Sequence, residues 1–383
     1  MIHELHAEKI LDSRGNWTVR AYVNGIPGTA PSGASKGIHE AKTKEPDESV
    51  DIINGKLQRI VGQKLNLGEI DIIIEAIDGT KNFEKIGGNT SIAVSFAVFN
   101  AIHKSRKIHQ ETFPYPLGNI YGGGAHGGAA TFQEFLSLPT KAKSICDALD
   151  TNAQFHHRLK KELKKKSGLI GINDEGALTS DISDLKALDI IASIAEDLDC
   201  RIGLDIAASC FFKNGKYIYS SLKKKLKPEQ QLDFIIDIAK KHKLAYIEDP
   251  FEENDFENTA RLTKEIGKKC LVCGDDLFVT DEERLSKGIR MNTANSLIIK
   301  PNQAGTISMA QDTTSLAFKN GLTPIISHRS GETCDSTISR LALLWSIPII
   351  KAGVIDMRIA KLNELIRLWN MAENPKMADL KKY

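Results

Sequence analysis

The apolar residues follow one spacing at the start of the chain and a different spacing after it. Residues 3–25 alternate between apolar and polar positions and end at Asn24-Gly25, which predicts a β-hairpin. The stretch after it carries apolar residues at helical spacing, with Asn89 as the expected N-cap of the last helix. The helices are predicted over residues 47–62, 68–77 and 89–105. A hairpin followed by helices predicts a small α+β capping domain, residues 1–113, which ends where Phe113-Pro-Tyr-Pro116 breaks the pattern.

From residue 114 onward, short apolar runs alternate with helical stretches, and each run ends in an ionisable residue. The runs are 201–205, 244–248, 270–275, 296–300, 324–328 and 347–351. Their spacing fits one strand and one helix per unit, and parallel strands need such crossovers. The pattern predicts an α/β fold in which residues 114–383 form a modified TIM (β/α)8 barrel with its active site at the carboxyl ends of the strands. An open doubly wound sheet is the alternative, but it needs a switch point that the pattern lacks.

Composition excludes several function classes. The 383 residues carry 51 Lys and Arg against 49 Asp and Glu, so no net field favours nucleic acid or an acidic membrane. The lysine clusters at 160–166 and 223–227 are interpreted as solvated helix faces, and no apolar stretch approaches the length of a membrane helix. Cys270 and Cys273 lie in an apolar run and are expected to be buried thiols. With no apolar leader in view, we expect a cytoplasmic protein.

Three of the predicted strands end in acidic residues, namely Asp205, Glu248 and Asp275. Any one of them could be an ordinary loop acid. Three on consecutive strands would repel one another unless a cation lay between them. Carboxylates that converge without His or Cys favour a hard cation such as Mg²⁺. The sequence therefore predicts a metal site at this end of the barrel.

The next three strand ends are basic: Lys300, His328 with Arg329 and Ser330 beside it, and Lys351. A lysine near a metal and other cations has a lowered pKa and can act as a base. Arg and Ser side by side suit an oxyanion such as phosphate. Metal, base and phosphate site together predict metal-assisted removal of a proton next to a carboxylate, on a phosphorylated substrate.

Two further segments carry candidate chemistry. Gly122–Gly127 matches a dinucleotide-binding glycine pattern, but a strand-like segment follows it where that motif requires a helix. We interpret it as a loop that presents His126 and Glu134. Asn173-Asp-Glu-Gly176 is predicted to be a turn that exposes an acidic pair, either as a plain turn or as a positioned general acid.

With these residues in view, the chain resembles the enolase (phosphopyruvate hydratase) family over nearly its whole length, with phrases similar to its archaeal branch. The matching segments are Leu11-Asp-Ser-Arg-Gly-Asn16, Pro31-Ser-Gly-Ala-Ser35, Gln133-Glu-Phe135, Asp174-Glu-Gly176, Gly203-Leu-Asp205, Ile247-Glu-Asp-Pro-Phe251, Gly274-Asp-Asp-Leu277, Lys300 with Asn302-Gln303, and Ser327-His-Arg-Ser-Gly-Glu-Thr333. The resemblance implies a barrel with an irregular start. It also implies the dehydration of 2-phosphoglycerate to phosphoenolpyruvate, a lyase step of glycolysis and gluconeogenesis.

The resemblance also implies the ligands and the roles. Two Mg²⁺ ions are expected, one conformational and one catalytic: Asp205, Glu248 and Asp275 would hold the first, and Ser35 would help to hold the second. Lys300 would remove the C2 proton, and Glu175, assisted by Glu134, would protonate the departing C3 hydroxyl. The remaining site residues would bind phosphate (Arg329, Ser330), steady the carboxylate (Lys351) or line the site (His126, Gln133, His328).

The family forms homodimers or larger assemblies, and here the chain departs from its pattern. Glu8 and Arg20 carry the reverse of the usual interface charges, and the partner segment is shortened to Ile355-Asp-Met357. A pairing of Glu8 with a C-terminal arginine such as Arg358 is one expected repair. Changes in the loops around the site leave two alternative functions open. The chain could be a paralogue that acts on another phosphorylated or phosphonate carboxylate, or a non-catalytic scaffold on the same fold.

Overall fold

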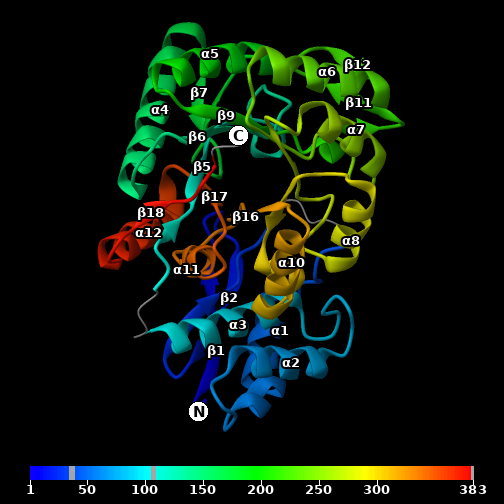
Figure 1. Cartoon of the computed structure of the whole chain (residues 1–383). Helices are drawn as coiled ribbons and strands as arrows, with labels where there is room; N and C mark the ends of the chain where they lie inside the picture. Colours follow the sequence, from blue (N-terminus) through cyan, green and yellow to red (C-terminus); the bar gives the residue numbers. More distant parts are fainter. Residues whose placement is uncertain (34–38, 105–108, 381–383) are drawn as a thin grey trace.

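The computed structural model describes residues 1–33, 39–104 and 109–380, and the chain forms two units (Figure 1). The N-terminal unit is a three-stranded antiparallel sheet in the order β1-β2-β3, against which a long apolar helix, α3, packs. Its strands are β1 (Leu5–Leu11), β2 (Trp17–Val23) and β3 (Ile26–Thr29). Its helices are α1 (Pro46–Asn54), the 3₁₀ helix η1 (Lys56–Ile60), α2 (Leu67–Asp78) and α3 (Gly88–His103). The predicted α+β content of this unit is confirmed.

Two local predictions in this unit need correction. Gly55 divides the predicted helix over 47–62 into α1 and η1. Asn89 does not cap α3, because the helix starts after Gly87, whose φ of 88° suits a residue without a side chain. The Asn89 side chain instead accepts from the backbone N–H of Lys44 at 2.9 Å and donates to its carbonyl at 2.9 Å. Asn89 therefore anchors the loop that enters α1.

Among the described residues, eight strands close into a barrel, because β17 pairs with β5. The strands are β5 (Tyr115–Gly122), β6 (Glu134–Leu138), β9 (Arg201–Asp205), β13 (Tyr246–Glu248), β14 (Leu271–Gly274), β15 (Ser296–Ile299), β16 (Thr323–Ser327) and β17 (Ile349–Gly353). All neighbouring pairs are parallel except those that involve β6, which runs antiparallel to β5 and β9. The predicted barrel with an irregular start is confirmed, and the open sheet is excluded.

Helices cover the outside of the barrel, and short strands decorate its ends (Figure 1). The helices are α4 (Ile145–Lys166), α5 (Asp184–Asp197), α6 (Pro228–Lys241), α7 (Phe256–Ile266), α8 (Glu282–Met291), α9 (Pro301–Ala304), α10 (Ile307–Lys319), α11 (Thr337–Leu344) and α12 (Ile359–Met371), with 3₁₀ turns η2 (Gly124–His126), η3 (Ala208–Phe211) and η4 (Asp356–Arg358). The remaining strands are β4 (Thr112–Phe113), β7 (Ile170–Ile172), β8 (Leu178–Ser180), β10 (Phe212–Lys213), β11 (Lys216–Tyr219), β12 (Lys224–Leu226) and β18 (Lys376–Met377).

The barrel interior is packed rather than open. One cluster of buried apolar side chains comes from successive strands and includes Leu117, Leu136, Leu271, Ile298 and Ile325. Cys273 belongs to the same cluster, and Cys270 is also buried, as predicted for both thiols. Because side chains fill the interior, substrate chemistry is confined to the mouth of the barrel.

The N-terminal unit meets the barrel at this mouth. Ser32 and Gly331 form an isolated antiparallel bridge, with N–H···O distances of 2.8 and 2.7 Å, and the Ser13 hydroxyl donates to the Ser330 carbonyl at 3.1 Å. A Cβ on Gly331 would lie 2.0 Å from the Ser32 hydroxyl oxygen and 2.5 Å from an Asp12 carboxylate oxygen. A glycine is therefore needed where the two units touch.

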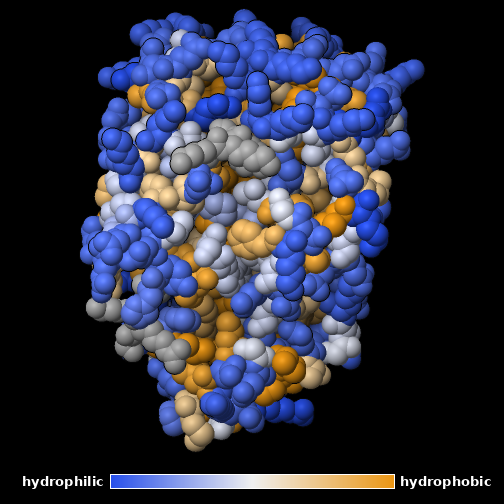
Figure 2. Space-filling model, in the orientation of Figure 1, coloured by the Kyte–Doolittle hydropathy of each residue, from blue (hydrophilic) through white to orange (hydrophobic). Residues whose placement is uncertain are grey.

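In Figure 2, hydrophilic and hydrophobic residues gather on different parts of the outer surface. Hydrophilic residues dominate the end that carries α4, α5 and α6, whereas hydrophobic residues gather toward the N-terminal unit. The lysines at 160–166 lie on the last turns of α4, as predicted, but those at 223–227 surround the strand β12 and not a helix. None of the described helices combines the length and the apolar character needed to cross a membrane.

Candidate active site

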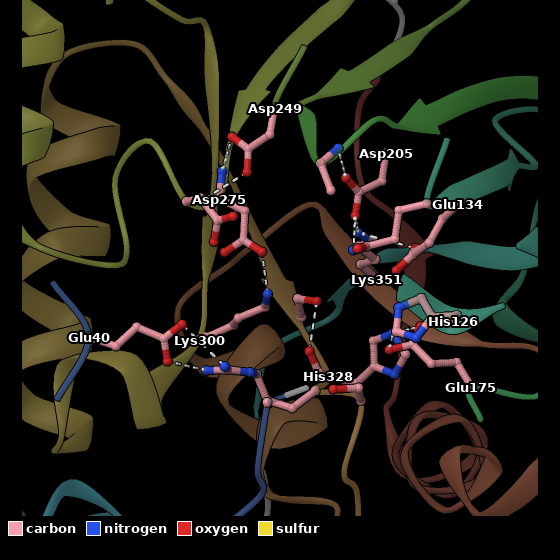
Figure 3. A pocket seen from close by; sticks show the side chains of 17 residues that line it. Glu40, His126, Glu134, Glu175, Asp205, Asp249, Asp275, Lys300, His328 and Lys351 are labelled. Atoms are coloured by element: carbon pink, nitrogen blue, oxygen red, sulfur yellow. Dashed lines mark hydrogen bonds and ion pairs between the residues drawn. The ribbon is translucent and has the colours of Figure 1, made fainter. Parts of the chain in front are cut away.

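A cavity opens at the carboxyl ends of the barrel strands. It gathers most of the residues predicted from the sequence, and Figure 3 shows them facing one another. The lining includes His126, Gln133, Glu134, Glu175, Asp205, Asp275, Lys300, His328, Arg329, Ser330 and Lys351, together with Gly33 and Glu40 of the N-terminal unit. Glu248 lies at the edge of the site and contacts Lys351. Ser35 lies outside the described residues.

Strand register brings the carboxylates together. Asp205 ends β9 and pairs in register with Glu248, which ends β13, and Asp275 follows β14 directly. Glu134 joins them because β6 is reversed: it begins its strand where its neighbours end, and it lies opposite Asp205. The Gln133 amide donates to an Asp205 oxygen at 3.4 Å. Four acidic side chains thus share one edge of the barrel.

Lys351 lies among these carboxylates. Its Nζ is 2.7 Å from Glu248, 2.9 Å from Asp205 and 3.2 Å from Glu134, and its side chain is buried. Burial opposes the charged form, but Asp205, Glu134 and Glu248 together raise the pKa of Lys351 well above its ordinary value. The residue lies two positions before the end of β17, and not at the strand end as predicted. It is held as an ammonium that offsets the charge of three acids.

Lys300 forms a close ion pair with Asp275. Burial alone would lower the pKa of Lys300, but Asp275 outweighs it, so the pKa is raised. The expected lowering refers to a lysine beside a metal ion, so it stays a prediction. Lys300 can lose its proton only when the negative charge of Asp275 is engaged elsewhere.

The acidic edge fits a hard cation. Burial, followed by the charge of Asp205, raises the pKa of Glu248 to about 8. In the part of the chain that the structure describes, its buried Oε1 has no hydrogen-bond partner. The donors are all oxygens, as Mg²⁺ prefers. Among the described residues, two other groups of side chains bring their ligand atoms within 4.8 Å of one another, and the three predicted ligands are not such a group. The two groups are Asp249, Asp275 and Asp276, and His126, Glu134 and Glu175.

Glu175 lies on the opposite side of the cavity from Lys300 (Figure 3). It was expected to be exposed in its turn, but it is only 3% exposed, and it accepts from the Asn119 amide at 3.1 Å. Burial raises its pKa, but His328, His126, Arg358 and Lys351 more than reverse this and hold it well below its ordinary value.

The pKa of Glu134 moves the other way. Burial raises it strongly, Lys351 only partly opposes this, and the neighbouring acids add to it. Two carboxyl groups with opposite shifts share one site, so Glu134 holds a proton more tightly than Glu175 does.

The predicted phosphate site is held from the N-terminal unit. Arg329 donates to both oxygens of Glu40 at 2.9 and 3.2 Å, and its backbone N–H donates to Glu332 at 3.0 Å. Arg329 and Glu40 are both buried. Arginine has five N–H donors, so it can keep Glu40 and still bind a second anion. Glu40 is thus a site residue that sequence reasoning missed.

Asp249 and Arg358 were also missed. Asp249 accepts the backbone N–H groups of Asp275 at 3.0 Å and Asp276 at 2.7 Å, so it fixes the loop that carries a predicted ligand. In the segment Ile247-Glu-Asp-Pro-Phe251, the pattern of strand ends indicates only the glutamate. Arg358 is fully buried beside His328, which also rules out its expected pairing with Glu8. Glu8 instead accepts from the Tyr22 hydroxyl at 2.6 Å and lies 3.7 Å from Arg20 in its own sheet.

Comparison with known proteins gives matches over the full length. A family model described as "Enolase, N-terminal domain" matches residues 2–113, and one described as "Enolase, C-terminal TIM barrel domain" matches residues 110–381. The boundary that we place after residue 113 stays a prediction. The enolases of Methanosphaera stadtmanae and Methanothermobacter thermautotrophicus are 42% and 40% identical to the chain, each match covering 99% of both sequences. That of Archaeoglobus fulgidus is 38% identical and covers 98% of the chain.

Proposed function

The chain belongs to the enolase family, and we propose that it dehydrates 2-phosphoglycerate to phosphoenolpyruvate as a carbon–oxygen lyase of glycolysis and gluconeogenesis. One observation carries the proposal beyond family membership. A buried lysine, Lys300, faces the carboxyl pair of Glu134 and Glu175 across one cavity (Figure 3). Loss of water from adjacent carbons needs a base at one carbon and an acid at the other.

The chain's own residues divide this work. Lys300 removes the proton from C2 once its ion pair with Asp275 is broken. The Glu134–Glu175 pair delivers a proton to the C3 hydroxyl as it leaves. Arg329 and Ser330 bind the phosphate, and Lys351 steadies the substrate carboxylate. His126, Gln133 and His328 line the site, and Gln133 and His328 contact Asp205 and Glu175 respectively.

Mg²⁺ fits the acidic edge, and we propose Asp205, Glu248 and Asp275 as its ligands. Bound there, it supplies positive charge that offsets the negative charge on the substrate carboxylate. A second ion with Ser35 among its ligands follows from the family resemblance alone. A homodimer or larger assembly is likewise proposed from that resemblance, and a cytoplasmic location is proposed from the cysteine usage and the N-terminal sequence.

The test is turnover of 2-phosphoglycerate by the purified protein in the presence of Mg²⁺, followed by the absorbance of phosphoenolpyruvate. We expect turnover that a chelator stops, that Lys300→Ala abolishes and that Lys287→Ala on the exposed face of α8 leaves intact. Tight binding of 2-phosphoglycerate without turnover would favour the scaffold. Neither binding nor turnover would favour a different phosphorylated or phosphonate carboxylate.

A further inference from the structure

Two imidazoles flank the Glu175 carboxylate, and different groups back them. Nε2 of His126 lies 3.5 Å from one Glu175 oxygen, and Nε2 of His328 lies 3.8 Å from the other. On the far side of each ring, Nδ1 of His126 is 2.8 Å from an Asp174 oxygen, whereas Nδ1 of His328 is 2.9 Å from Nε of Arg358. A carboxylate stands behind one ring and a guanidinium behind the other.

The partner of Nδ1 decides where the proton of each ring lies. A carboxylate only accepts, so His126 carries a hydrogen on Nδ1. A guanidinium only donates, so Nδ1 of His328 must be the acceptor and the ring hydrogen must be on Nε2. We propose that Arg358 is a positioning residue that holds His328 as the neutral Nε2–H tautomer, so that His328 acts only as a hydrogen-bond donor toward Glu175 and the substrate. Its catalytic consequence rests on the proposed function.

The charges around His328 agree with this assignment. The ring is buried, and the charged groups with the largest effect on it are one anion, Glu175, and three cations, Arg358, Lys351 and Lys300. Burial is the largest cause that lowers the pKa of His328 well below its ordinary value; Glu175 opposes this, and Arg358, Lys351 and Lys300 add to the lowering. The pKa values of the two histidines therefore shift in opposite directions: against the effect of burial, Glu175 and Asp174 raise that of His126, whereas that of His328 is lowered.

Arg358 is itself held rigidly enough for this task. Its other guanidinium nitrogens donate to Asp356 at 2.8 Å and to the Ser330 carbonyl at 2.5 Å. A Cβ on Gly353 would lie 2.7 Å from Cδ of Arg358 and 2.8 Å from the Glu175 carbonyl oxygen, so the chain keeps a glycine where the arginine passes. Arg358 thus ties the His328 imidazole to Asp356 and to the backbone at Ser330.

The decisive measurement is ¹⁵N NMR of the imidazoles in substrate-free protein, with the His328 signals identified by their loss in His328→Gln. We expect a protonated Nε2 and an acceptor Nδ1 in the wild type, unchanged between about pH 5.5 and 8.5. Arg358→Met removes every donor and should mix the tautomers, while Arg358→Lys keeps one charged donor and should largely preserve the wild-type signals. A wild-type His328 that carries its hydrogen on Nδ1, or titrates in this range, overturns the proposal.

Kinetics separate this role from a structural one. Arg358→Met should lower kcat for 2-phosphoglycerate by about 10- to 100-fold, as the loss of an orienting partner does elsewhere, with a smaller change in KM. In the His328→Gln background the same change should add little, because it acts through the missing ring. Additive losses, or a loss confined to KM, would assign Arg358 to the phosphate loop instead and overturn the proposal.

The spectra do not depend on the proposed activity, whereas the kinetic measurements do. If Arg358→Met fails to fold, the wild-type and Arg358→Lys spectra still decide the tautomer. If the protein does not turn over 2-phosphoglycerate, the spectra still show whether Arg358 fixes the ring. Failure of the positioning role and failure of the proposed function are therefore distinguishable.

Discussion

Each cationic side chain named in the cavity forms an ion pair with an acidic side chain, and these pairs must change when a substrate binds and reacts. Lys300 pairs with Asp275, Arg329 with Glu40, and Lys351 with three carboxylates. A buried charge that loses its partner is expensive, so it must exchange one partner for another and not simply part from it. The carboxylate and phosphate of a substrate supply the replacement anions for the lysine and arginine side chains.

Asp275 tests the metal assignment at the scale of one residue. Asp275→Asn removes one ligand charge and should weaken Mg²⁺ binding, measured by calorimetric titration without substrate, by at least about 100-fold. Asp276→Asn, in the same loop and with the same change of charge, is the matched control and should bind Mg²⁺ almost normally. A loss in Asp276→Asn with retention in Asp205→Asn would move the ion to the group formed by Asp249, Asp275 and Asp276.

Lys300 and Glu175 should separate the two halves of the reaction. Lys300→Ala should stop the exchange of the C2 proton of 2-phosphoglycerate with deuterated solvent, a loss of about 10²-fold or more, because the base is gone. Glu175→Gln should keep this exchange and lose dehydration, because proton removal precedes departure of the hydroxyl. Proton NMR of the substrate follows both. Continued exchange in Lys300→Ala would place the base elsewhere.

Among the secondary-structure elements, strand ends could be predicted but strand direction could not. The sequence indicates Asp205, Glu248 and Asp275 because each is an ionisable residue at the end of an apolar run. Glu134 precedes its apolar run, and only the reversal of β6 brings it to the same edge. That reversal is a property of how the barrel closes and leaves no periodic mark in the sequence.

Partners that hold a catalytic group from another element are harder still to predict. Glu40 and Arg358 are single charged residues in unremarkable local patterns, and their roles arise from contacts 289 and 30 residues away along the chain. Glu175 was placed correctly in a turn, but its burial depends on the packing of the 353–358 segment against Gly176. Position in the chain predicts the type of element, whereas tertiary packing decides the environment of a side chain.

Asp71 joins two helices from different units and should make stability depend on pH. It lies buried in α2 and accepts from the backbone N–H and the hydroxyl of Ser308, at 3.0 and 2.6 Å, at the start of α10. Burial raises its pKa from 3.8 to about 6. The folded state therefore binds this proton more tightly than the unfolded state does. The resulting stabilisation is complete below about pH 4 and is lost as the pH rises through 6, about 3 kcal/mol in all.

Asp71→Asn should remove that part of the pH dependence. Urea unfolding at several values between about pH 4 and 7 measures it as the difference in slope between variant and wild type. Glu69→Gln, on the exposed side of the same helix, is the matched control and should keep the wild-type slope. Equal slopes in Asp71→Asn and the wild type would show that the Asp71 carboxyl, at the contact between α2 and α10, does not bind this proton.

Across the whole molecule, the site belongs to both units. The N-terminal unit contributes Glu40, which pairs with Arg329, and Ser13, whose hydroxyl donates to the Ser330 carbonyl. It also contributes Arg14, which lies 3.3 Å from Asp174. The barrel supplies the carboxylates and lysines. Because the turn between β1 and β2 contacts Ser330 and Asp174 at the mouth of the barrel, we expect changes in the N-terminal unit to affect catalysis even when no barrel residue is altered.

Assembly is the prediction that involves the entire surface. Glu8 and Arg20 already pair across β1 and β2 within one chain, and Arg358 is buried and therefore not available to bridge two copies. The hairpin tip beside them exposes Leu11 and Trp17 at 53% and 57%. Exposed ion pairs contribute only about 0–1 kcal/mol each, whereas buried apolar area holds most dimers together.

We therefore expect a dimer at micromolar concentration whose dissociation constant changes less than about tenfold between low and high salt. Sedimentation velocity at both salt concentrations measures it. A monomer under all conditions would show that the interface itself has been lost, and a steep salt dependence would show that other charges, not these two, join the copies.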